Sequence, residues 1–509
     1  MKKIIFAAIA MIAVYLVWSI NSAKPTNNTL TISGPFEFHG TDMAKDGHIY
    51  SRLGVTQSLT QLKTTGEVVP LLAERWSVDE NGTRWQFEIR QGVKFHDGQS
   101  LSAKDVAASL LRAKTMPGVF AKVPVKAINA QGQNLEIVLE TPYLPLLNTL
   151  AHFSLGVLSA DSFDSEGNIV HFNATGPYQV VELVAPHKVS LTRFNDYWGN
   201  KASIEKVEYL AGHRSESRAL QVQSGQTDIA YTIDAISKQN LENTDNVAVQ
   251  SVNLPRTVLL KVNNHHPYLS DSKARQAISL AINREGIASN VLYAPGSEAY
   301  QLFSSSQNEW HVDQHKPKRN LELSRQLLTE LGWRKGDNGI LQREGKPFKL
   351  TLVTYSDRPE LPMIATALQN QLLDIGVQIE VSIDNSSVIP AGHHDNTLEL
   401  ALIARNFGMT GSPLPVLYKD FTNKKGSDLG HMNWHSEQLQ NDLTKLVSVS
   451  DPAQQHQLTQ SIATVLAQEL PVIPIVYSSQ HVAYNKSLTG LVVDPFEIDY
   501  RLSELSFND

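Results

Sequence analysis

The chain has 509 residues, of which 41% are hydrophobic and 19% charged, proportions that are ordinary for a globular protein. This length allows two or more domains with large cores. A formal net charge of −7 without a basic block argues against nucleic acid as a partner. The absence of cysteine excludes disulfides, thiolate metal ligands and cysteine nucleophiles.

The N-terminus has the pattern of an export signal. Lys2 and Lys3 precede a run from Ile4 to Ile20 that is apolar except for Ser19, as in the charged and hydrophobic regions of a signal peptide. Residues 1–23 are therefore predicted to be a signal peptide, and because the run is close to the shortest membrane-spanning length, an uncleaved N-terminal anchor is the alternative. No cysteine is present to carry a lipid, so the exported protein is expected in the periplasm.

The most informative stretch covers residues 69–115. Asp79–Gly82 predicts a tight turn. Apolar and polar residues alternate from Thr83 to Arg90, which indicates a half-buried strand. Ser102 is a good N-cap for the helix that the following apolar spacing predicts.

Strands and helices alternate along most of the remaining chain, which predicts an α/β protein with mixed sheets. The predicted strands are 29–33, 134–140, 257–263, 348–355, 377–383, 399–404 and 470–475, and the predicted helices are 142–150, 274–292, 321–331, 363–373 and 453–468.

Two blocks of residues closely resemble the signatures of family 5 extracytoplasmic solute-binding proteins, the peptide, opine and nickel receptors of ABC importers. The first block carries the pattern through Pro70, Leu72, Ala73, Trp76, Gly82, Phe87, Arg90, Gly92, Val93, Lys94, Phe95, Asp97, Gly98, Ala103, Asp105 and Val106. The second begins with Thr175, Gly176, Pro177 and Tyr178 and continues through Tyr197, Trp198 and Gly199. A generic hairpin followed by a helix would account only for the turn glycines and the apolar alternation.

The resemblance implies a two-lobed periplasmic binding protein fold of the class II type, with an extra subdomain in the first lobe. Lobe 1 is expected to comprise residues 24–254 and 477–509, with the subdomain at about 45–170, and lobe 2 residues 255–476. The ligand would lie between the lobes, where concave sites are common. The implied partners are a small-molecule, metal-chelate or peptide ligand and the permease subunits of an ABC importer, and the implied state is a monomer without cofactor.

Motifs for catalysis are absent or defective. The sequence contains neither G-x-S-x-G nor H-E-x-x-H. Gly339 to Lys346 resembles a phosphate-binding loop, but the spacing is one residue too long and Pro347 replaces the Ser/Thr. An enzyme is therefore not predicted.

The segment ARNFGMTGSPLP resembles the family loop that lines the ligand cleft. Peptide receptors typically carry an acidic residue four positions before a proline there, and counting back from Pro413 this position holds Met409. Arg405, Phe407 and the proline instead resemble the pattern of the nickel and metal-chelate branch. Arg405 could bind a ligand carboxylate with both ends of its guanidinium group, or it could form a salt bridge that shapes the loop.

Other segments supply weaker candidates for the ligand site. Relatives approach the cleft near His39, and the chelate-contacting arginine and tryptophan of the nickel branch have no clear counterpart near Phe120. At the position where the nickel branch carries its ligating histidine, this chain has Lys425, and His431 lies near that position in the sequence. The complete set of predicted ligand contacts is Arg405, Asn406, Phe407, Met409, His39, Phe120, His431 and Trp434. The expected ligand is a metal chelate, an opine or a nickel complex, with an oligopeptide or dipeptide as the alternative, and a membrane-tethered sensor or chaperone is a different class of function.

Overall fold

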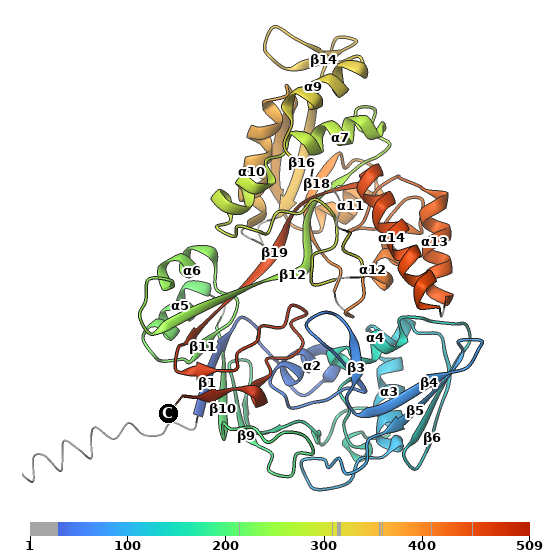
Figure 1. The fold of residues 1–509 in the computed structure, drawn as a ribbon, viewed down its shortest axis with the longest axis vertical. Helices are drawn as coiled ribbons and strands as arrows, with labels where there is room; N and C mark the ends of the chain where they lie inside the picture. The colour runs from blue at the N-terminus through green and yellow to red at the C-terminus, as the bar shows by residue number, and fades with distance from the viewer. Residues whose placement is uncertain are drawn as a thin grey trace, which may run out of the picture.

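Two long strands organise the fold. β12 (Val247–Val262) and β19 (Val472–Asn485) pair antiparallel along most of their lengths. In the computed structural model they run from one lobe into the other (Figure 1). The structure describes residues 29–508 except 213, 308, 313–316, 356, 357, 359, 409 and 450, so the predicted signal or anchor at 1–23 lies outside the described residues.

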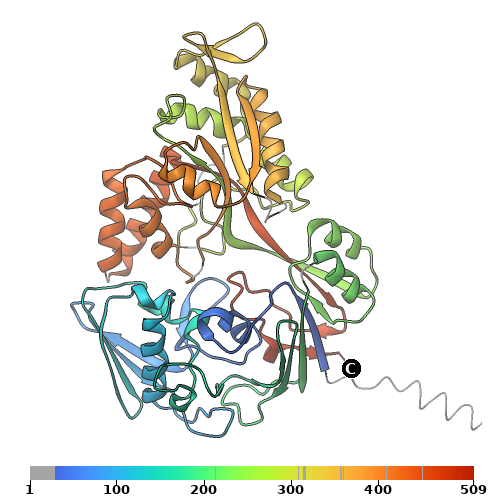
Figure 2. The same cartoon turned by 180° about the vertical axis from the view of Figure 1, so that it is seen from behind.

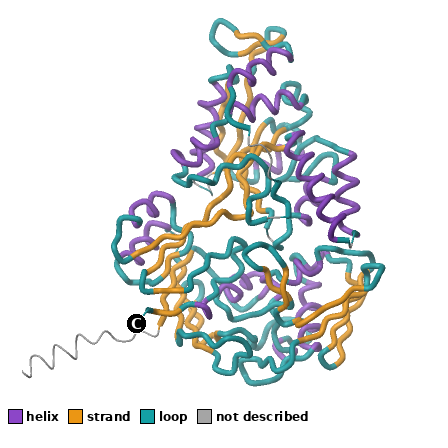
Figure 3. The backbone as a smooth tube through the Cα atoms, viewed as in Figure 1, coloured by secondary structure: helices purple, strands orange, loops and turns teal. Residues whose placement is uncertain are grey.

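A single ten-stranded sheet spans both lobes, and Figure 3 shows it as a continuous band of strands. Its order is β17 (Gln378–Asp384), β16 (Lys349–Tyr355), β18 (Leu400–Asn406), β12, β19, β11 (Ile229–Ala230), β1 (Thr29–Gly34), β10 (Lys206–Ala211), β9 (Lys188–Arg193) and β8 (Tyr178–Val184). The first three strands form the sheet of lobe 2, and the last five form that of lobe 1. We propose that the lobes divide as the sequence suggests, at 254/255 and 476/477, within or beside the two crossing strands.

Lobe 2 covers both faces of its sheet with helices. On β12, Val258 and Leu260 pack into one buried apolar cluster, whereas Leu259 packs into another on the opposite face, as the two-residue period of a strand requires. Figure 1 shows α10 on one side of the sheet and α13 and α14 on the other. The helices are α7 (Ser272–Ala281), α8 (Arg284–Gly286), α9 (Leu321–Glu330), α10 (Glu360–Leu373), α11 (Val388–His394), α12 (Leu414–Phe421), α13 (Glu437–Ser448) and α14 (Pro452–Glu469).

The predicted helix at 274–292 is interrupted in the structure. α7 ends at Ala281, and Ile282 has extended backbone angles. The side chain of Asn283 then accepts a hydrogen bond from the backbone N–H of Gly286 at 2.9 Å and starts a new turn. An asparagine cap competes with helix continuation in this way, and the apolar spacing alone did not reveal it.

Lobe 1 contains a second, four-stranded sheet that forms the subdomain. Its order is β4 (Ala73–Val78), β5 (Arg84–Ile89), β7 (Asn134–Leu139) and β6 (Val125–Gln131), and α3 (Ala103–Thr115) packs on it. The predicted inner face of β5 is buried. Ser102 begins α3 as predicted, and its backbone N–H donates to the carboxylate of Asp105 at 2.9 Å.

Shorter elements complete the chain, and Figure 2 shows them from behind. They are β2 (Thr60–Leu62), β3 (Val68–Pro70), α2 (Met43–Arg52), α4 (Leu146–Leu150), α5 (Ser215–Gln223), α6 (Ala235–Leu241), β13 (Arg334–Lys335), β14 (Leu341–Arg343), β15 (Lys346–Pro347), β20 (Leu488–Thr489) and β21 (Ser506–Phe507). Within the described part of the chain, every helix is too short or too polar to cross a membrane.

Candidate functional site

The strand order of lobe 2 marks one edge of its sheet as a place for ligand binding. β16 pairs in parallel with both β17 and β18, so the carboxyl ends of these three strands share one edge. The chain passes from β16 outward to β17 and then returns to β18 on the other side of β16. Ligands of open α/β sheets bind outside the carboxyl ends of the strands at such a reversal.

A hollow of about 650 Å³ lies at this edge. Tyr355 at the end of β16 and Ser386 after β17 contribute to its wall, together with Arg358. Asp428 and Leu429, from the loop between α12 and α13, form another part of the wall. We call this site the lobe-2 hollow. Its lining combines a cation, a carboxylate, hydroxyls and apolar carbon, which suits a polar organic ligand.

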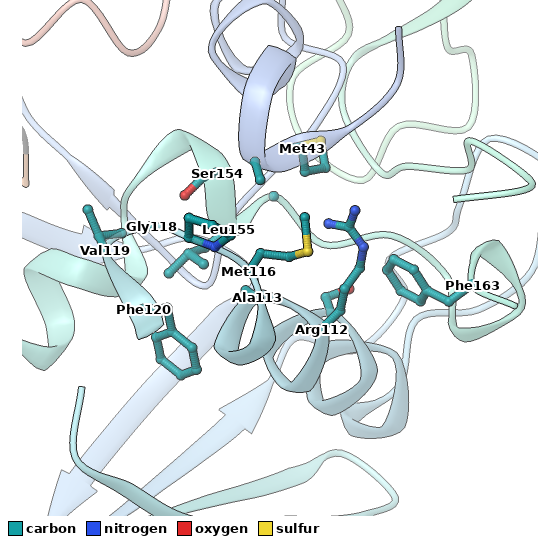
Figure 4. Close-up of a pocket in the computed structure, with 14 residues that line it drawn as sticks. Met43, Arg112, Ala113, Met116, Gly118, Val119, Phe120, Ser154, Leu155 and Phe163 are labelled. Carbon is teal, nitrogen blue, oxygen red and sulfur yellow. The ribbon is translucent and has the colours of Figure 1, made fainter. Parts of the chain in front are cut away.

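A smaller hollow lies in lobe 1, between the start of α2 and the end of α3 (Figure 4). Met43, Met116 and Arg112 converge on it. The Arg112 guanidinium donates to Asp42 at 2.9 Å and to the carbonyl oxygen of Gly167 at 2.7 Å. Desolvation raises the pKa of Asp42, but the hydrogen bonds from Arg112 and from the backbone of Ala44, together with the positive charges of Arg112 and Lys45, outweigh it, so the pKa lies below its ordinary value. The lobe-1 hollow is therefore mainly apolar, with one paired charge.

The two lobes also contact each other directly. A β-carbon built on Gly411, in the loop after β18, would lie 2.4 Å from Cδ1 of Leu62 in lobe 1. Leu62 packs in turn against Ala151, which precedes the hollow-lining Ser154 by three residues. On another part of the boundary, the backbone N–H of Leu144 donates to the carbonyl oxygen of Val447 at 3.0 Å. The loop after β18 therefore meets lobe 1 directly when the lobes are together.

Gly411→Ala is expected to hold the lobes apart. Its φ of +73° strains any L side chain, and the new methyl group would overlap Leu62. Gly345→Ala is the matched control, because Gly345 has a φ of +74° and nothing within 4 Å of the added carbon. Both variants should lose about 1 kcal/mol of stability from the left-handed backbone. Measured on protein that retains its bound compound, only Gly411→Ala should increase the radius of gyration in small-angle scattering, and equal radii for the two variants would contradict this reading of the contact.

Arg405 is held by a neighbouring carboxylate. Its Nε and Nη2 atoms donate to the two oxygens of Asp420 at 2.7 and 3.0 Å, and the side chains are 11% and 1% exposed. Because this bidentate pair occupies the edge of the guanidinium group that would grip a ligand carboxylate, the geometry favours the salt bridge that shapes the loop over direct ligand binding.

Four of the predicted ligand contacts are buried side chains. Phe120 is among the residues that line the lobe-1 hollow (Figure 4), and its side chain is buried in the subdomain core. Phe407, Trp434 and His431 belong to or pack within the apolar layer of lobe 2, where burial lowers the pKa of His431 to about 3 and keeps the imidazole neutral. These rings therefore contribute to the cores beside the cleft, which is the commonest environment for aromatic side chains.

The remaining predicted contacts lie nearer to solvent. His39 has a side chain that is 77% exposed, and its backbone N–H donates to Asp46 at 3.1 Å. Asn406 is half-buried, and its side-chain oxygen accepts from the N–H of Gly408 at 2.8 Å. Met409 lies outside the described residues. Sequence reasoning missed Met43, Met116, Arg112, Tyr355 and Arg358, although Arg358 follows a predicted strand end and could have been noticed.

Comparison with known proteins identifies the family. Residues 67–428 match the family of bacterial extracellular solute-binding proteins, family 5. The nickel-binding protein NikA of Staphylococcus aureus is 25% identical over 88% of this chain and 89% of its own length. The oligopeptide-binding protein AppA of Bacillus subtilis is 26% identical over 88% of this chain and 84% of its own length.

A solved structure supports the fold. The crystal structure of a nickel ABC transporter protein from Bacillus halodurans superposes with a TM-score of 0.84, covering 94% of this chain and 99% of that one at 22% identity. Members of the family bind solutes for ABC transporters and are not enzymes. The chain belongs to family 5 of the bacterial extracellular solute-binding proteins.

Proposed function

We propose that this protein is the periplasmic receptor of an ABC importer, and that it closes its lobes on a small solute and delivers it to the membrane permease. The observation that carries the proposal is a hollow in each of two lobes that contact each other, one at the strand reversal of lobe 2 and one beside α2 and α3. A ligand that touches both lobes would stabilise the closed form by its differential affinity for that form. Export by residues 1–23 and a monomeric state are parts of the same proposal.

A small metal chelate or an opine is the favoured ligand class. The cleft loop carries Met409 where a peptide receptor would typically offer a carboxylate to the peptide ammonium group. Arg358 at the lobe-2 hollow is half-buried and pairs with Glu360 only at 3.7 Å, so it is the cation we propose for a ligand carboxylate. One relative is named for nickel.

An oligopeptide is the second candidate. The lobe-2 hollow alone, at about 650 Å³, falls within the size range of sites for drug-sized ligands. Another relative is named for oligopeptides.

Native mass spectrometry of protein purified from its own periplasm, with elemental analysis, tests the choice. A metal and a small organic acid released together are expected. A copurified peptide without metal would replace the chelate with the second candidate. Protein unfolded, dialysed and refolded is the control, and re-adding the released compound at about 100 times its Kd should raise the free energy of unfolding by about 2.7 kcal/mol.

A further inference from the structure

A lysine occupies an otherwise apolar layer of lobe 2. In the paired strands β12 and β18, Leu259 faces Ile403 and Lys261 faces Ala401, and the three apolar residues belong to the cluster under α12, α13 and α14. Lys261 is 0% exposed. Keeping this lysine protonated costs free energy, because burial disfavours the charged form and lowers the pKa of Lys261 to about 7. The negative charges of Asp420 and Asp428 oppose this shift.

The ammonium group of Lys261 is bonded entirely to one loop. Its Nζ atom donates to the carbonyl oxygens of Ser427 and Gly430, both at 2.8 Å, and to that of His431 at 3.3 Å. Three acceptors use all three of its protons. The loop between α12 and α13 therefore folds around this one cation.

The same loop is joined to the Arg405–Asp420 pair. The hydroxyl of Ser427 donates to Oδ1 of Asp420 at 2.7 Å. A β-carbon on Gly430 would lie 2.6 Å from Cβ of Asp420, so the loop and α12 are in close contact. Lys261, Arg405 and Asp420 thus form a buried set of two cations and one anion that connects β12, β18, α12 and the loop.

This loop also supplies part of the ligand cleft. Asp428 and Leu429 lie between the residues that bond Lys261 and form a wall of the lobe-2 hollow. Replacing a buried ionic group by an apolar one is often neutral or stabilising, so stability alone does not explain the charge. We propose that Lys261 is a positioning residue for ligand binding: its ammonium group holds the 423–434 loop in the one conformation that presents Asp428 and Leu429 to the solute.

The role of Lys261 in ligand binding rests on the proposed function, and the experiment tests the two proposals separately. Hydrogen–deuterium exchange of the ligand-free protein at pH 6.5 would compare wild type, Lys261→Met and the control Lys273→Met, whose lysine is half exposed and pairs with Glu330 at 2.8 Å. In Lys261→Met, amides of residues 423–434 are expected to exchange at least tenfold faster, while those of β12 and β18 keep their wild-type rates. Unchanged loop exchange, or equal acceleration throughout lobe 2, would overturn the proposal.

A second arm measures binding. Nickel(II) with two equivalents of L-histidine, glutathione and a nonapeptide serve as probes, at a temperature where all variants are folded. Any probe that binds wild type is expected to bind Lys261→Met at least tenfold more weakly and Lys273→Met equally well; wild-type affinity in Lys261→Met would overturn the positioning role. If wild type binds no probe, these three compounds are excluded as ligands of the proposed receptor, and the exchange result alone decides the role of Lys261. If Lys261→Met does not fold, Lys261→Gln, whose amide has only two N–H donors for the three carbonyl oxygens, should accelerate exchange in the same loop, and its failure to do so would overturn the proposal.

Discussion

Acidification from pH 7 to pH 4.5 is expected to unfold the protein. His152, His393, His431 and His481 are each at most 9% exposed, and burial lowers the pKa of His431 to about 3 and those of the other three to about 4. The unfolded chain binds protons at these histidines near pH 6.5, whereas the folded protein does not until pH 4 or below. Stability is therefore full above pH 6.5 and is lost as pH falls towards 4.

One buried carboxyl group opposes this loss. Burial raises the pKa of Asp499 to about 7, so the folded protein binds a proton there before the unfolded chain does, and stability gains from acid at this site. Burial also lowers the pKa values of His48 and His96 to about 4. With these two histidines and Asp499 included, the balance is about five protons taken up on unfolding near pH 5, or about 7 kcal/mol of stability lost per pH unit. A typical total of about 5–15 kcal/mol would be consumed within a few units.

Urea unfolding at pH 7.5, 6.5, 5.5 and 5.0 measures this slope. His481→Gln should reduce the proton uptake by about one, because the amide cannot be protonated but can still bond the Ser251 hydroxyl that now lies 2.7 Å from the ring nitrogen. His39→Gln alters a largely exposed side chain and should leave the slope unchanged. Stability that stays constant between pH 7.5 and 5.0 would contradict the buried, neutral state of these histidines.

Truncating either member of the Arg405–Asp420 pair is expected to cost about 3–5 kcal/mol of stability, because an unpaired charge would remain buried. The pair is bidentate and almost fully enclosed. Arg405→Ala and Asp420→Ala should each show this cost in urea unfolding, and the double variant should cost several kcal/mol less than their sum.

The Lys273–Glu330 pair provides the control for this cycle. Its atoms are 2.8 Å apart, but the side chains are 50% and 41% exposed, so its coupling should stay below about 1 kcal/mol. Equal coupling energies for the two pairs would show that the Arg405–Asp420 pair is solvated. They would contradict its role as a structural salt bridge that shapes the loop.

Local patterns predicted the elements better than they predicted the site. The alternation around β5 and the cap at Ser102 depend on neighbouring residues, and both are present in the structure. The partner of Arg405 lies 15 residues away on a helix that the sequence analysis did not predict. Lys261 was visible as a charge in the predicted strand 257–263, but its three acceptors belong to a loop about 170 residues further on.

The hollows also depend on distant segments. Tyr355, Ser386 and Leu429 reach the lobe-2 hollow from the end of β16, from the segment after β17 and from the loop between α12 and α13. Only the return of β18 to the inner side of β16 brings them to one edge. Periodicity predicts which residues of a strand are buried, but it does not predict strand order. Resemblance predicted four rings as ligand contacts, at Phe120, Phe407, Trp434 and His431. Their burial, and the position of Phe120 in the wall of the lobe-1 hollow, follow from packing that one sequence does not specify.

Small-angle scattering of the purified protein, with and without the compound released from it, tests the central claim that two lobes close on a solute. We expect the radius of gyration to decrease when the compound is added, and Gly411→Ala to prevent most of that decrease while Gly345→Ala does not. Scattering curves that are identical with and without a compound shown to bind would contradict closure of the lobes.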